Sequence, residues 1–597
     1  MALNRLLRGL HAVAAVLAVL LAADALRIFA GEQWLAPWLP LETHFYFAML
    51  LVLLPPVFLT FRTRWWLDWP LALVVAGACG YGLYHGQIMV DEAWEFAAPD
   101  AAVWVGLAIW IALLEALRRS AGWGLALIAG TFSVLPIFAA DLPEALAGLS
   151  STWQETAAYH TYSIESIFGL PFRAFVQLVV GFLVFGVALQ QSGGGRFFLD
   201  LAFALLGRVR GGPAKVAIVS SGLMGSMSGS VVTNVLTTGQ LTIPAMRRMG
   251  FRGEVAAGVE ACASTGGVLL PPVMGSTAFV MATFLEVPYF QVAAAAAIPA
   301  VLYFLALFLQ IDAHAARHAL AGERDVPGVW QTLRGGWYYV GAFVALVVFL
   351  VVLQREAVAP YYATALLLVL NQFSAEHRWN LLGAVDFLAA TGRLLIELVA
   401  VLAGVGLIVG ALSVTGLAGT LVNDLLALAD GRVWLLIVMG AVTSFVLGIG
   451  MTVTAAYIFL AIVLAPALEQ AGLDAMAVHL FILYWAMLSF ITPPVALGAF
   501  AAASIAGANA LRTGLAAMRL GGAIYILPFA FLLAPALVLN GTTGATVLAA
   551  APVVAGLWLL AGGFQGYLIG YGSLSSSVVR TLVAAGGVAL MLLPAAI

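Results

Sequence analysis

The chain has 597 residues, of which 63% are apolar and 9% are charged, and its mean hydropathy is +1.06. A soluble globular protein carries about 25% charged residues, so this composition is too apolar for a water-exposed surface. Apolar runs of about 20 residues, long enough for a helix to cross a bilayer, follow one another along most of the sequence. The net charge of −3 and the lack of a basic tail argue against a nucleic-acid partner. The sequence therefore predicts an all-α polytopic membrane protein.

Four apolar runs open the chain, and their flanks alternate between basic and acidic residues. Arg5 and Arg8 precede the first run, and Arg62 and Arg64 follow the second. Because Lys and Arg concentrate on the cytoplasmic side of a membrane, we place the N-terminus in the cytoplasm. The first run is too long for a typical signal-peptide core, so we expect it to stay as a span. We assign residues 1–120 to a four-span N-terminal unit and 121–165 to a linking span with an outer loop.

Two later regions contain apolar stretches that Gly, Ser, Thr and Pro interrupt. In the first region, the stretch 214–248 has basic residues at both ends, which predicts a re-entrant hairpin. The next stretch, 253–284, contains Pro271-Pro272, which breaks a helix. The second region repeats this order. We expect inverted repeat 1 over 166–311, a scaffold and connector over 312–393, inverted repeat 2 over 394–540 with a hairpin at 433–470 and a broken span at 475–506, and C-terminal spans over 541–597.

The two regions match at a fixed offset of 222 residues, while the charges beside them change sign. The matched pairs are Pro244 with Pro466, Gly250 with Gly472, Ser230 with Thr452, Pro271-Pro272 with Pro493-Pro494, Arg247 with Glu469, and Arg252 with Asp474. This pattern predicts two halves of opposite membrane orientation, with a transporter's midplane site at the interrupted segments. In all we expect about 15 spans, one of them near 516–539, two re-entrant hairpins, and a periplasmic C-terminus.

The interrupted segments offer hydroxyl and backbone groups but no carboxylate. Such oxygens suit a monovalent cation such as sodium, helix N-termini attract an anion, and a divalent ion would require carboxylates. Any single hydroxyl has the alternative of bonding back to its own helix. Glu260 and His479 lie inside the broken spans. Both are candidates for a proton-carrying or a structural polar role, because charges inside a bilayer are costly.

Five motifs of the interrupted regions are Gly211-Gly212-Pro213-Ala214-Lys215, Ala263-Ser264-Thr265-Gly266-Gly267, Pro271-Pro272-Val273-Met274-Gly275, Gly448-Ile449-Gly450-Met451-Thr452 and Thr492-Pro493-Pro494. Together they resemble the fused membrane subunit of tripartite ATP-independent periplasmic (TRAP) transporters, and the TAXI subclass most closely. The resemblance implies sodium-coupled import of a small organic acid across the bacterial inner membrane by an elevator motion. A periplasmic TAXI-type binding protein would deliver the solute. The run Met451-Thr452-Val453-Thr454 departs from the family, which often has Met-Pro-Thr-Thr there.

The resemblance also implies two sodium sites, each between a hairpin tip and the neighbouring broken span. The first would use Ser226, Ser228, Gly229, Ser230, Asn234, Gly266, Gly267, Val268 and Leu270. The second would use Gly448, Gly450, Met451, Thr452, Ser489 and Thr492. The organic acid is assigned to Ser230, Thr233, Ser264, Thr265, Ser276, Thr277, Thr452 and Thr454.

Other functions make different demands on the sequence. A membrane enzyme would need a catalytic constellation, and the sequence has no His-Glu-x-x-His, no Gly-x-Ser-x-Gly and no paired intramembrane aspartates. We therefore predict no catalytic residues and no organic cofactor, with sodium ions as the transported cations. A proton-coupled transporter that uses Glu260 and a channel lined by the broken helices remain as alternatives.

Overall fold

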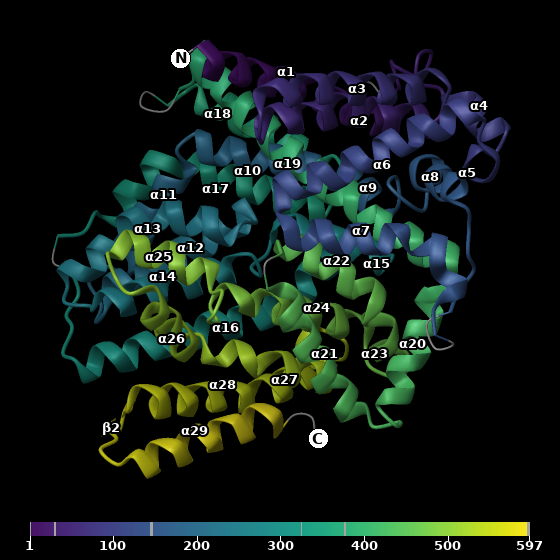
Figure 1. Ribbon diagram of the computed structural model, residues 1–597. Helices are drawn as coiled ribbons and strands as arrows, with labels where there is room; N and C mark the ends of the chain where they lie inside the picture. The colour runs from purple at the N-terminus through teal and green to yellow at the C-terminus, as the bar shows by residue number, and fades with distance from the viewer. Residues whose placement is uncertain are drawn as a thin grey trace. The chain divides into compact units, whose positions relative to one another are not determined.

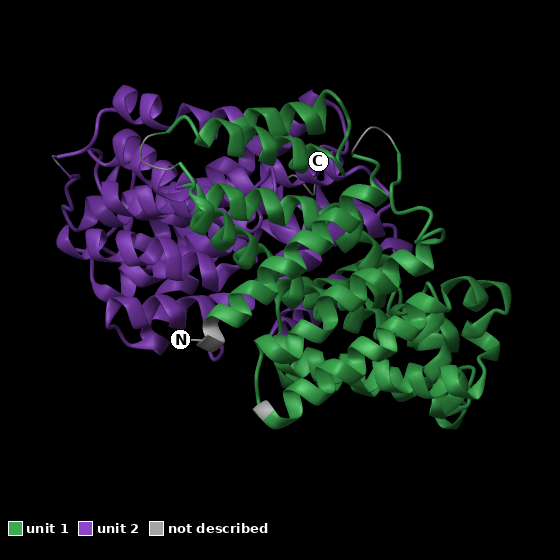
Figure 2. Ribbon diagram, turned by 90° about the horizontal axis from the view of Figure 1, so that it is seen from above, with its two compact units in different colours: residues 1–192, 342–436, 450–467 green, residues 193–341, 437–449, 468–597 purple. Residues whose placement is uncertain are grey.

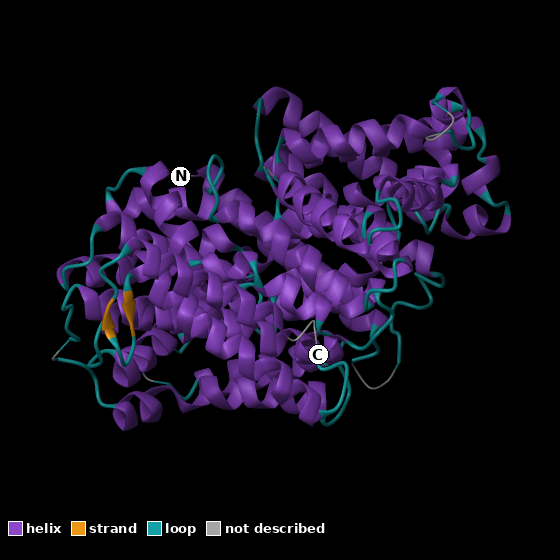
Figure 3. Cartoon of the chain, turned by 90° about the horizontal axis from the view of Figure 1, so that it is seen from below, coloured by secondary structure: helices purple, strands orange, loops and turns teal. Residues whose placement is uncertain are grey.

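The structure is a computed structural model that describes residues 2–28, 32–143, 147–323, 325–374, 378–449 and 451–593. Nearly all of the secondary structure in these ranges is helical (Figure 1). Ten described helices are long and apolar enough to cross a membrane, or up to 11 if a bent pair counts as one span. The strands in these ranges are β1 (Tyr567–Leu568) and β2 (Gly572–Ser573), which pair antiparallel (Figure 3). These findings confirm the predicted all-α polytopic membrane fold.

The chain divides into two compact units, coloured separately in Figure 2. Three segments make up the first unit, and they are Met1–Ser192, Ala342–Leu436 and Gly450–Ala467. The second unit consists of Gly193–Gly341, Ile437–Ile449 and Leu468–Ile597. Three of the five boundaries fall inside helices, which are α17 (Val329–Val351), α21 (Val433–Gly448) and α23 (Ala465–Gln470).

The first unit is built around α19 (Leu381–Thr415), which packs against α1, α2, α6, α7, α9 and α10. The other elements of this unit are α1 (Ala2–Ala25), α2 (Glu42–Thr60), α3 (Trp65–Tyr84), α4 (Gly86–Asp91), α5 (Trp94–Ala97), α6 (Asp100–Ala121), α7 (Trp123–Phe138), η1 (Ala139–Asp141), α8 (Trp153–Tyr162), α9 (Leu170–Ala174), the π-helical turn η3 (Phe175–Val179), α10 (Val180–Gln191), α18 (Ala359–Asn371), α20 (Leu417–Leu428) and α22 (Val453–Val463). Helices α1, α2 and α3 lie side by side (Figure 1).

Helix α19 is longer than the span near 394–414 that its apolar run suggests. Asn380 caps its start, because its Oδ1 accepts a hydrogen bond from the Gly383 N–H at 2.8 Å. The helix ends at Gly416, whose φ of 74° lies in the left-handed region that glycine adopts most easily. A Cβ on Gly406 would lie 2.3 Å from Ser166 O, so only glycine permits this approach to the loop before α9.

The second unit is built around α14 (Gly253–Gly267), which packs against α12, α13, α25 and α26. The other elements of this unit are α11 (Gly194–Leu206), α12 (Gly212–Ser228), α13 (Val231–Arg248), α15 (Gly275–Phe284), α16 (Tyr289–Arg317), α24 (Ala475–Met487), η4 (Leu488–Phe490), α25 (Leu497–Ala506), α26 (Ala510–Leu520), η5 (Gly522–Tyr525), α27 (Leu527–Leu533), η6 (Pro535–Val538), α28 (Thr543–Gln565) and α29 (Ser577–Leu592). Every residue of α14 from 256 to 267 is buried, and most are Gly, Ala or Ser. Small side chains let neighbouring helices approach closely, which explains the central place of α14.

The predicted span near 516–539 is not one straight helix. The chain there forms α26 and then a second helical segment, Gly522–Leu533, bent by 69° from the first. Helix α26 is amphipathic, since Thr513, Gly514 and Ala517 are buried while Leu511 and Leu515 are each 55% exposed.

Candidate functional site

The first interrupted stretch is a helix-turn-helix in the second unit. Helix α12 ends at Ser228, and Gly229 follows with a φ of 63°. Ser230 then caps α13, because its Oγ accepts a hydrogen bond from the Thr233 N–H at 3.3 Å. A left-handed glycine and a serine N-cap are the residues that end one helix and start the next most favourably. The tip of the predicted hairpin is therefore fixed by local chemistry.

The following stretch is two helices separated by an irregular segment. Helix α14 ends at Gly267 and α15 begins at Gly275. Pro271 and Pro272 have no N–H to donate, so they remove two hydrogen bonds that a continuing helix would make. Met274 has a φ of 54° and starts α15 from the left-handed region. Val268 and Leu269 are buried at the break, where helical backbone pairing has ended.

The hairpin tip touches both sides of this break through glycines. A Cβ on Gly225 would lie 2.7 Å from Gly267 Cα, and a Cβ on Gly229 would lie 2.7 Å from Gly275 Cα. Real Cβ atoms essentially never come so close to another carbon atom. The tip and the break therefore meet backbone to backbone, which brings the carbonyl and N–H groups of two helix ends into one place.

Most of the predicted hydroxyl ligands in this region bond to their own helices. Ser226 donates to Leu223 O at 2.8 Å, and Thr265 donates to Ala261 O at 2.8 Å. Ser228 Oγ lies 3.5 Å from the backbone oxygen of Ser230. Ser226 and Thr265 are fully buried. Back-bonding uses the hydroxyl hydrogen and leaves oxygen lone pairs, so these groups keep some capacity to coordinate a cation.

Among the predicted ligands of the first site, Asn234 has one buried polar atom without a hydrogen-bond partner in the described residues. Its Nδ2 donates to Ser221 O at 2.7 Å, which fixes the orientation of the amide. Its Oδ1 is buried and has no hydrogen-bond partner among the described residues. The amide lies against the glycine contact, because a Cβ on Gly225 would be 2.8 Å from Asn234 Nδ2. An unpaired buried acceptor is costly unless a ligand or water satisfies it.

The remaining members of the first site have varied positions. Gly266 packs against Tyr303, since a Cβ there would lie 2.2 Å from that ring. Leu270 is partly buried, and its N–H donates to Gly267 O at 3.1 Å. Thr233 is exposed, whereas Thr277 is buried and Ser276 is partly buried on α15. All of these residues belong to the second unit, where the tip meets the break through Gly225 with Gly267 and Gly229 with Gly275.

Glu260 lies on α14 with its carboxyl group completely buried. Its Oε1 accepts hydrogen bonds from Ser221 at 2.7 Å, Thr238 at 2.5 Å and Ser264 at 3.2 Å. Its Oε2 accepts one from Thr242. No positively charged residue in the described part of the chain pairs with it. The four hydroxyls come from α12, α13 and α14, so this carboxyl group joins the hairpin to the broken helix.

The same hydroxyls also have other acceptors. Thr238 Oγ1 lies 2.8 Å from Asn234 O, and Thr242 Oγ1 lies 3.1 Å from Thr238 O. A hydroxyl has one hydrogen, so it donates either to the backbone or to the carboxylate. If Glu260 is protonated, it donates to one threonine, which then donates to its backbone carbonyl. The cluster accepts both protonation states without moving a side chain.

The second interrupted region has the same local design. Thr452 caps α22, because its Oγ1 accepts a hydrogen bond from the Ala455 N–H at 3.4 Å. Met451 and Thr454 are buried, while Gly450 lies outside the described residues. Met451, Thr452 and Thr454 belong to the first unit, and Gly448, Ser489 and Thr492 to the second. The second predicted site is thus described in two parts.

The part in the second unit consists of one close contact and two hydroxyls. A Cβ on Gly448 would lie 2.3 Å from Ala486 O. Ser489 donates to Ala486 O at 3.1 Å, and Thr492 donates to Leu488 O at 2.6 Å. Thr492 Oγ1 also lies 2.5 Å from the hydroxyl of Tyr525. Tyr525 was missed by the sequence analysis, since it lies beyond the broken span and carries no motif.

The two regions share backbone conformations at the sequence offset of 222. Gly250 and Gly472 have φ values of 94° and 89°, and Met274 and Ala496 have φ values of 54° and 34°. Ser230 and Thr452 are matched N-caps. Both matched Pro-Pro bonds, Pro271-Pro272 and Pro493-Pro494, are cis. The correspondence therefore extends from residue identity to local conformation, while the opposite membrane orientation of the halves stays a prediction.

His479 lies near the start of α24 rather than at the centre of a broken span. Its Nε2 is 3.2 Å from Glu469 Oε1, and the side chains are 5% and 34% exposed. Glu469 belongs to α23, so the pair ties the end of the hairpin to the beginning of the next helix. This geometry agrees with the structural polar role.

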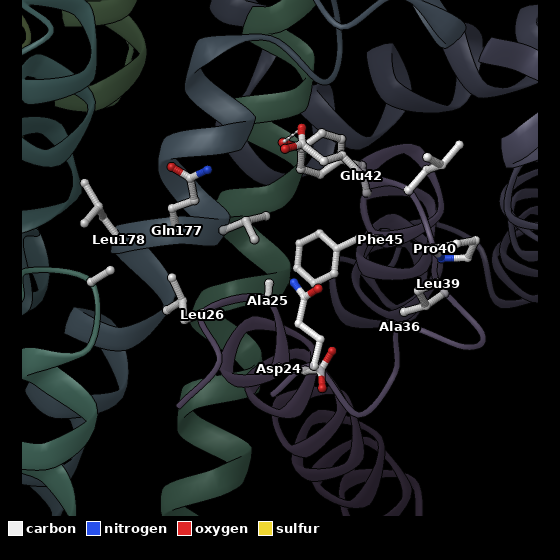
Figure 4. Close-up of a pocket in the computed structure, with 15 residues that line it drawn as sticks. Asp24, Ala25, Leu26, Ala36, Leu39, Pro40, Glu42, Phe45, Gln177 and Leu178 are labelled. Atoms are coloured by element: carbon white, nitrogen blue, oxygen red, sulfur yellow. Dashed lines mark hydrogen bonds between the residues drawn. The ribbon is translucent and has the colours of Figure 1, made fainter. Parts of the chain in front are cut away.

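A pocket of about 360 Å³ lies in the first unit, and none of its lining residues is a predicted site residue. Its polar lining includes Asp24, Glu42 and Gln177 among apolar side chains (Figure 4). Asp24 Oδ1 already accepts the N–H groups of Trp34 and Leu35, and Glu42 accepts the hydroxyl of Tyr46.

Interrupted helices inside an apolar helical fold define a polytopic membrane transporter. The family described as "Tripartite ATP-independent periplasmic transporter, DctM component" matches residues 108–544, more than half of the chain. The chain belongs to this family of TRAP transporter permeases. It is therefore a transporter and not an enzyme, as the sequence predicted.

Several curated relatives are TRAP permeases. The chain is 23% identical over 373 residues to the C4-dicarboxylate TRAP transporter large permease protein DctM of Pseudomonas aeruginosa, covering 61% of this chain and 82% of that protein. It is 26% identical over 337 residues to the isethionate TRAP transporter permease protein DctMQ of Oleidesulfovibrio alaskensis, covering 55% and 52%. It is 24% identical over 345 residues to the 2,3-diketo-L-gulonate TRAP transporter large permease protein YiaN of Escherichia coli, covering 54% and 76%.

Proposed function

We propose that this chain is the fused membrane subunit of a TAXI-type TRAP transporter in a bacterial inner membrane, which imports a small carboxylate or dicarboxylate with sodium. The relatives named above carry organic anions in their names, which supports an organic acid as the solute. The family match begins at residue 108 and leaves the first three apolar helices outside it. That division supports a small membrane subunit joined to the large one.

The observation that carries sodium coupling is the glycine contact beside Asn234. Two helix ends meet there backbone to backbone, and one buried amide oxygen has no hydrogen-bond partner in the described ranges. No carboxylate belongs to this tip, so a monovalent cation suits it better than a divalent one. We assign the organic acid to the hydroxyls of Ser230 and Thr452 and to the helix N-termini that these residues cap.

Uptake into proteoliposomes tests this proposal. We expect labelled organic acids to enter only with a cognate periplasmic binding protein and an inward sodium gradient. At about 2.3 kcal/mol per charge per 100 mV, each excess cation adds driving force when the membrane is polarised. Equal uptake with choline in place of sodium, under a proton gradient, contradicts sodium coupling. Strong uptake by the permease alone contradicts the need for a binding protein.

A second candidate is coupling to protons through Glu260. The observation that favours it is the hydroxyl cluster around the buried carboxyl group, which accommodates the protonated and the ionised forms. In this case Glu260→Gln abolishes uptake that a proton gradient drives. Glu254→Gln is the matched control, because Glu254 lies on the same helix with 23% of its side chain exposed. Sodium-driven uptake that Glu260→Gln leaves intact would assign Glu260 a structural role.

A further inference from the structure

The C-terminal end of α28 holds a cluster of three arginines, Arg317, Arg519 and Arg580, from three other helices. All donate hydrogen bonds to the carbonyls of the last turn, Gly563–Gln565. Arg317 Nη1 donates to Gln565 O at 2.7 Å, and Arg580 Nη2 donates to Phe564 O at 3.1 Å. Arg519 donates to the same Phe564 carbonyl through Nε and Nη2. The cluster joins α16, α26 and α29 around one helix end.

A buried hydrogen-bond network connects the helices that carry the cluster. Gln565 Nε2 donates to Gln310 Oε1 at 2.6 Å, and Gln310 Nε2 donates to the backbone oxygen of Arg519 at 3.3 Å. His314 Nδ1 lies 3.2 Å from Gln565 Oε1. Both glutamine side chains are at most 2% exposed. The three arginines therefore lie on helices that buried hydrogen bonds hold together, and not on loops.

The charge of the cluster exceeds what capping requires. The C-terminus of a helix carries about half a negative charge, whereas three guanidinium groups carry three positive charges. No carboxylate in the described parts of the chain forms an ion pair with Arg317, Arg519 or Arg580. Asp312, which is also on α16, is already paired with Arg210 and Lys215. Each guanidinium has five N–H donors, and at most two are used here, so most donors remain free for an anion.

The surroundings place the cluster where lipid headgroups lie. On α26, Leu511 and Leu515 are each 55% exposed and precede Arg519 at four-residue intervals, so the three share one face. On α29, Val578 and Leu582 are 65% and 66% exposed beside Arg580. An exposed apolar stripe that ends in arginine matches a lipid whose chains cover the stripe and whose headgroup meets the cation.

We infer that Arg317, Arg519 and Arg580 bind the phosphate of an anionic phospholipid. Helices α28 and α29, in yellow in Figure 1, lie almost entirely beyond the family match. The cluster thus forms where this C-terminal hairpin meets α16 and α26. The predicted topology puts it on the cytoplasmic side, where basic pockets between helices bind such headgroups. The lipid would fasten the hairpin to the rest of the second unit.

Lipid titration of the purified full chain, followed by native mass spectrometry, tests this inference. We expect phosphatidylglycerol to bind at least about tenfold more tightly than phosphatidylcholine. Replacing the three arginines by glutamine should abolish this preference. Arg512→Gln is the matched control, since Arg512 is exposed on α26 and is not part of the cluster. The absence of a preference in the wild type, or its persistence in the triple variant, overturns the inference.

Two further measurements separate the lipid role from capping and from free anions. Arg580→Lys keeps the charge but loses the forked hydrogen bonds to Gly563 O and Phe564 O. Arg580→Gln loses both. The inference requires the preference to survive in Arg580→Lys and to weaken in Arg580→Gln, and equal loss in both would show that the arginine acts only as a cap. Displacement of phosphatidylglycerol by inorganic phosphate at a similar concentration would identify a free-anion site and also refute the lipid assignment.

Discussion

Replacing Gly267 by alanine tests the contact between the hairpin tip and the helix break. The new Cβ would lie 2.7 Å from Gly225 Cα, 2.7 Å from Ser221 O and 3.2 Å from Gly222 O. All three are backbone atoms, so no side chain can rotate away. Carbon atoms in contact normally lie about 3.5–4.0 Å apart, and α12 and α14 must therefore separate by roughly 1 Å.

The cost to folding and the cost to function should differ. Overpacking costs about 1–3 kcal/mol, and replacing glycine by alanine within a helix returns up to about 1 kcal/mol, so the net loss of stability is about 0–2 kcal/mol. A site displaced by about 1 Å loses its ligand geometry. We expect the apparent sodium affinity to fall by at least about tenfold in Gly267→Ala, which corresponds to 1.4 kcal/mol.

Sodium titration of solute uptake in proteoliposomes measures this effect, and thermal unfolding in detergent measures the stability. Gly253→Ala is the control on the same helix, because its Cβ would meet Ala508 Cβ at an ordinary 3.5 Å. It should leave both quantities near their wild-type values. A wild-type sodium half-saturation in Gly267→Ala would refute the assignment of the first site to this contact.

Three other predictions concern polar side chains. Ser230→Ala and Thr452→Ala each remove an N-cap, which costs about 1 kcal/mol of stability. Each should also lower the apparent sodium affinity by about ten- to a hundredfold if the hydroxyls bind the ion. An unchanged sodium half-saturation of uptake in both variants would leave only backbone ligands. Asn234→Ala removes the unpaired Oδ1 and should weaken sodium binding at least about tenfold. A variant that keeps the wild-type rate of uptake and the wild-type sodium half-saturation would contradict that role. Thr492→Val should weaken sodium coupling more than Tyr525→Phe, although both remove the same hydroxyl pair, and equal transport defects would show that only this hydrogen bond matters.

Helix ends were predictable from the sequence where single residues determine them. Gly229 and Ser230 end and start helices by local chemistry, and α14 ends before Pro271-Pro272, which lack the N–H groups that a continuing helix uses. The hairpin tip and the break therefore lie where the sequence indicates. The start of α19 was not predictable from its apolar run, because the helix begins after its N-cap Asn380, well before that run. The bend after α26 has no proline in it, and tertiary packing of Gly521 and Gly522 accompanies it.

The candidate site was predictable as a region but not as a set of atoms. Hydroxyls at a helix interruption indicate a site, yet Ser226 and Thr265 turn out to bond to their own helices. The four hydroxyls around Glu260 come from three helices, and their convergence depends on packing that no spacing encodes. Asn234 shows the same limit, since only the structure identifies which of its amide atoms is unpaired.

The glycine contact between α12 and α14 has a mechanical consequence. Gly225 and Gly267 have no side chains, so no rotamer change at this contact can accommodate a movement of α12 along α14. A shift of α12 by one residue would bring the side chain of Met224 or Ser226 against the backbone of α14. We therefore expect the hairpin and the broken helix to move as one body in any cycle that carries cargo across the bilayer.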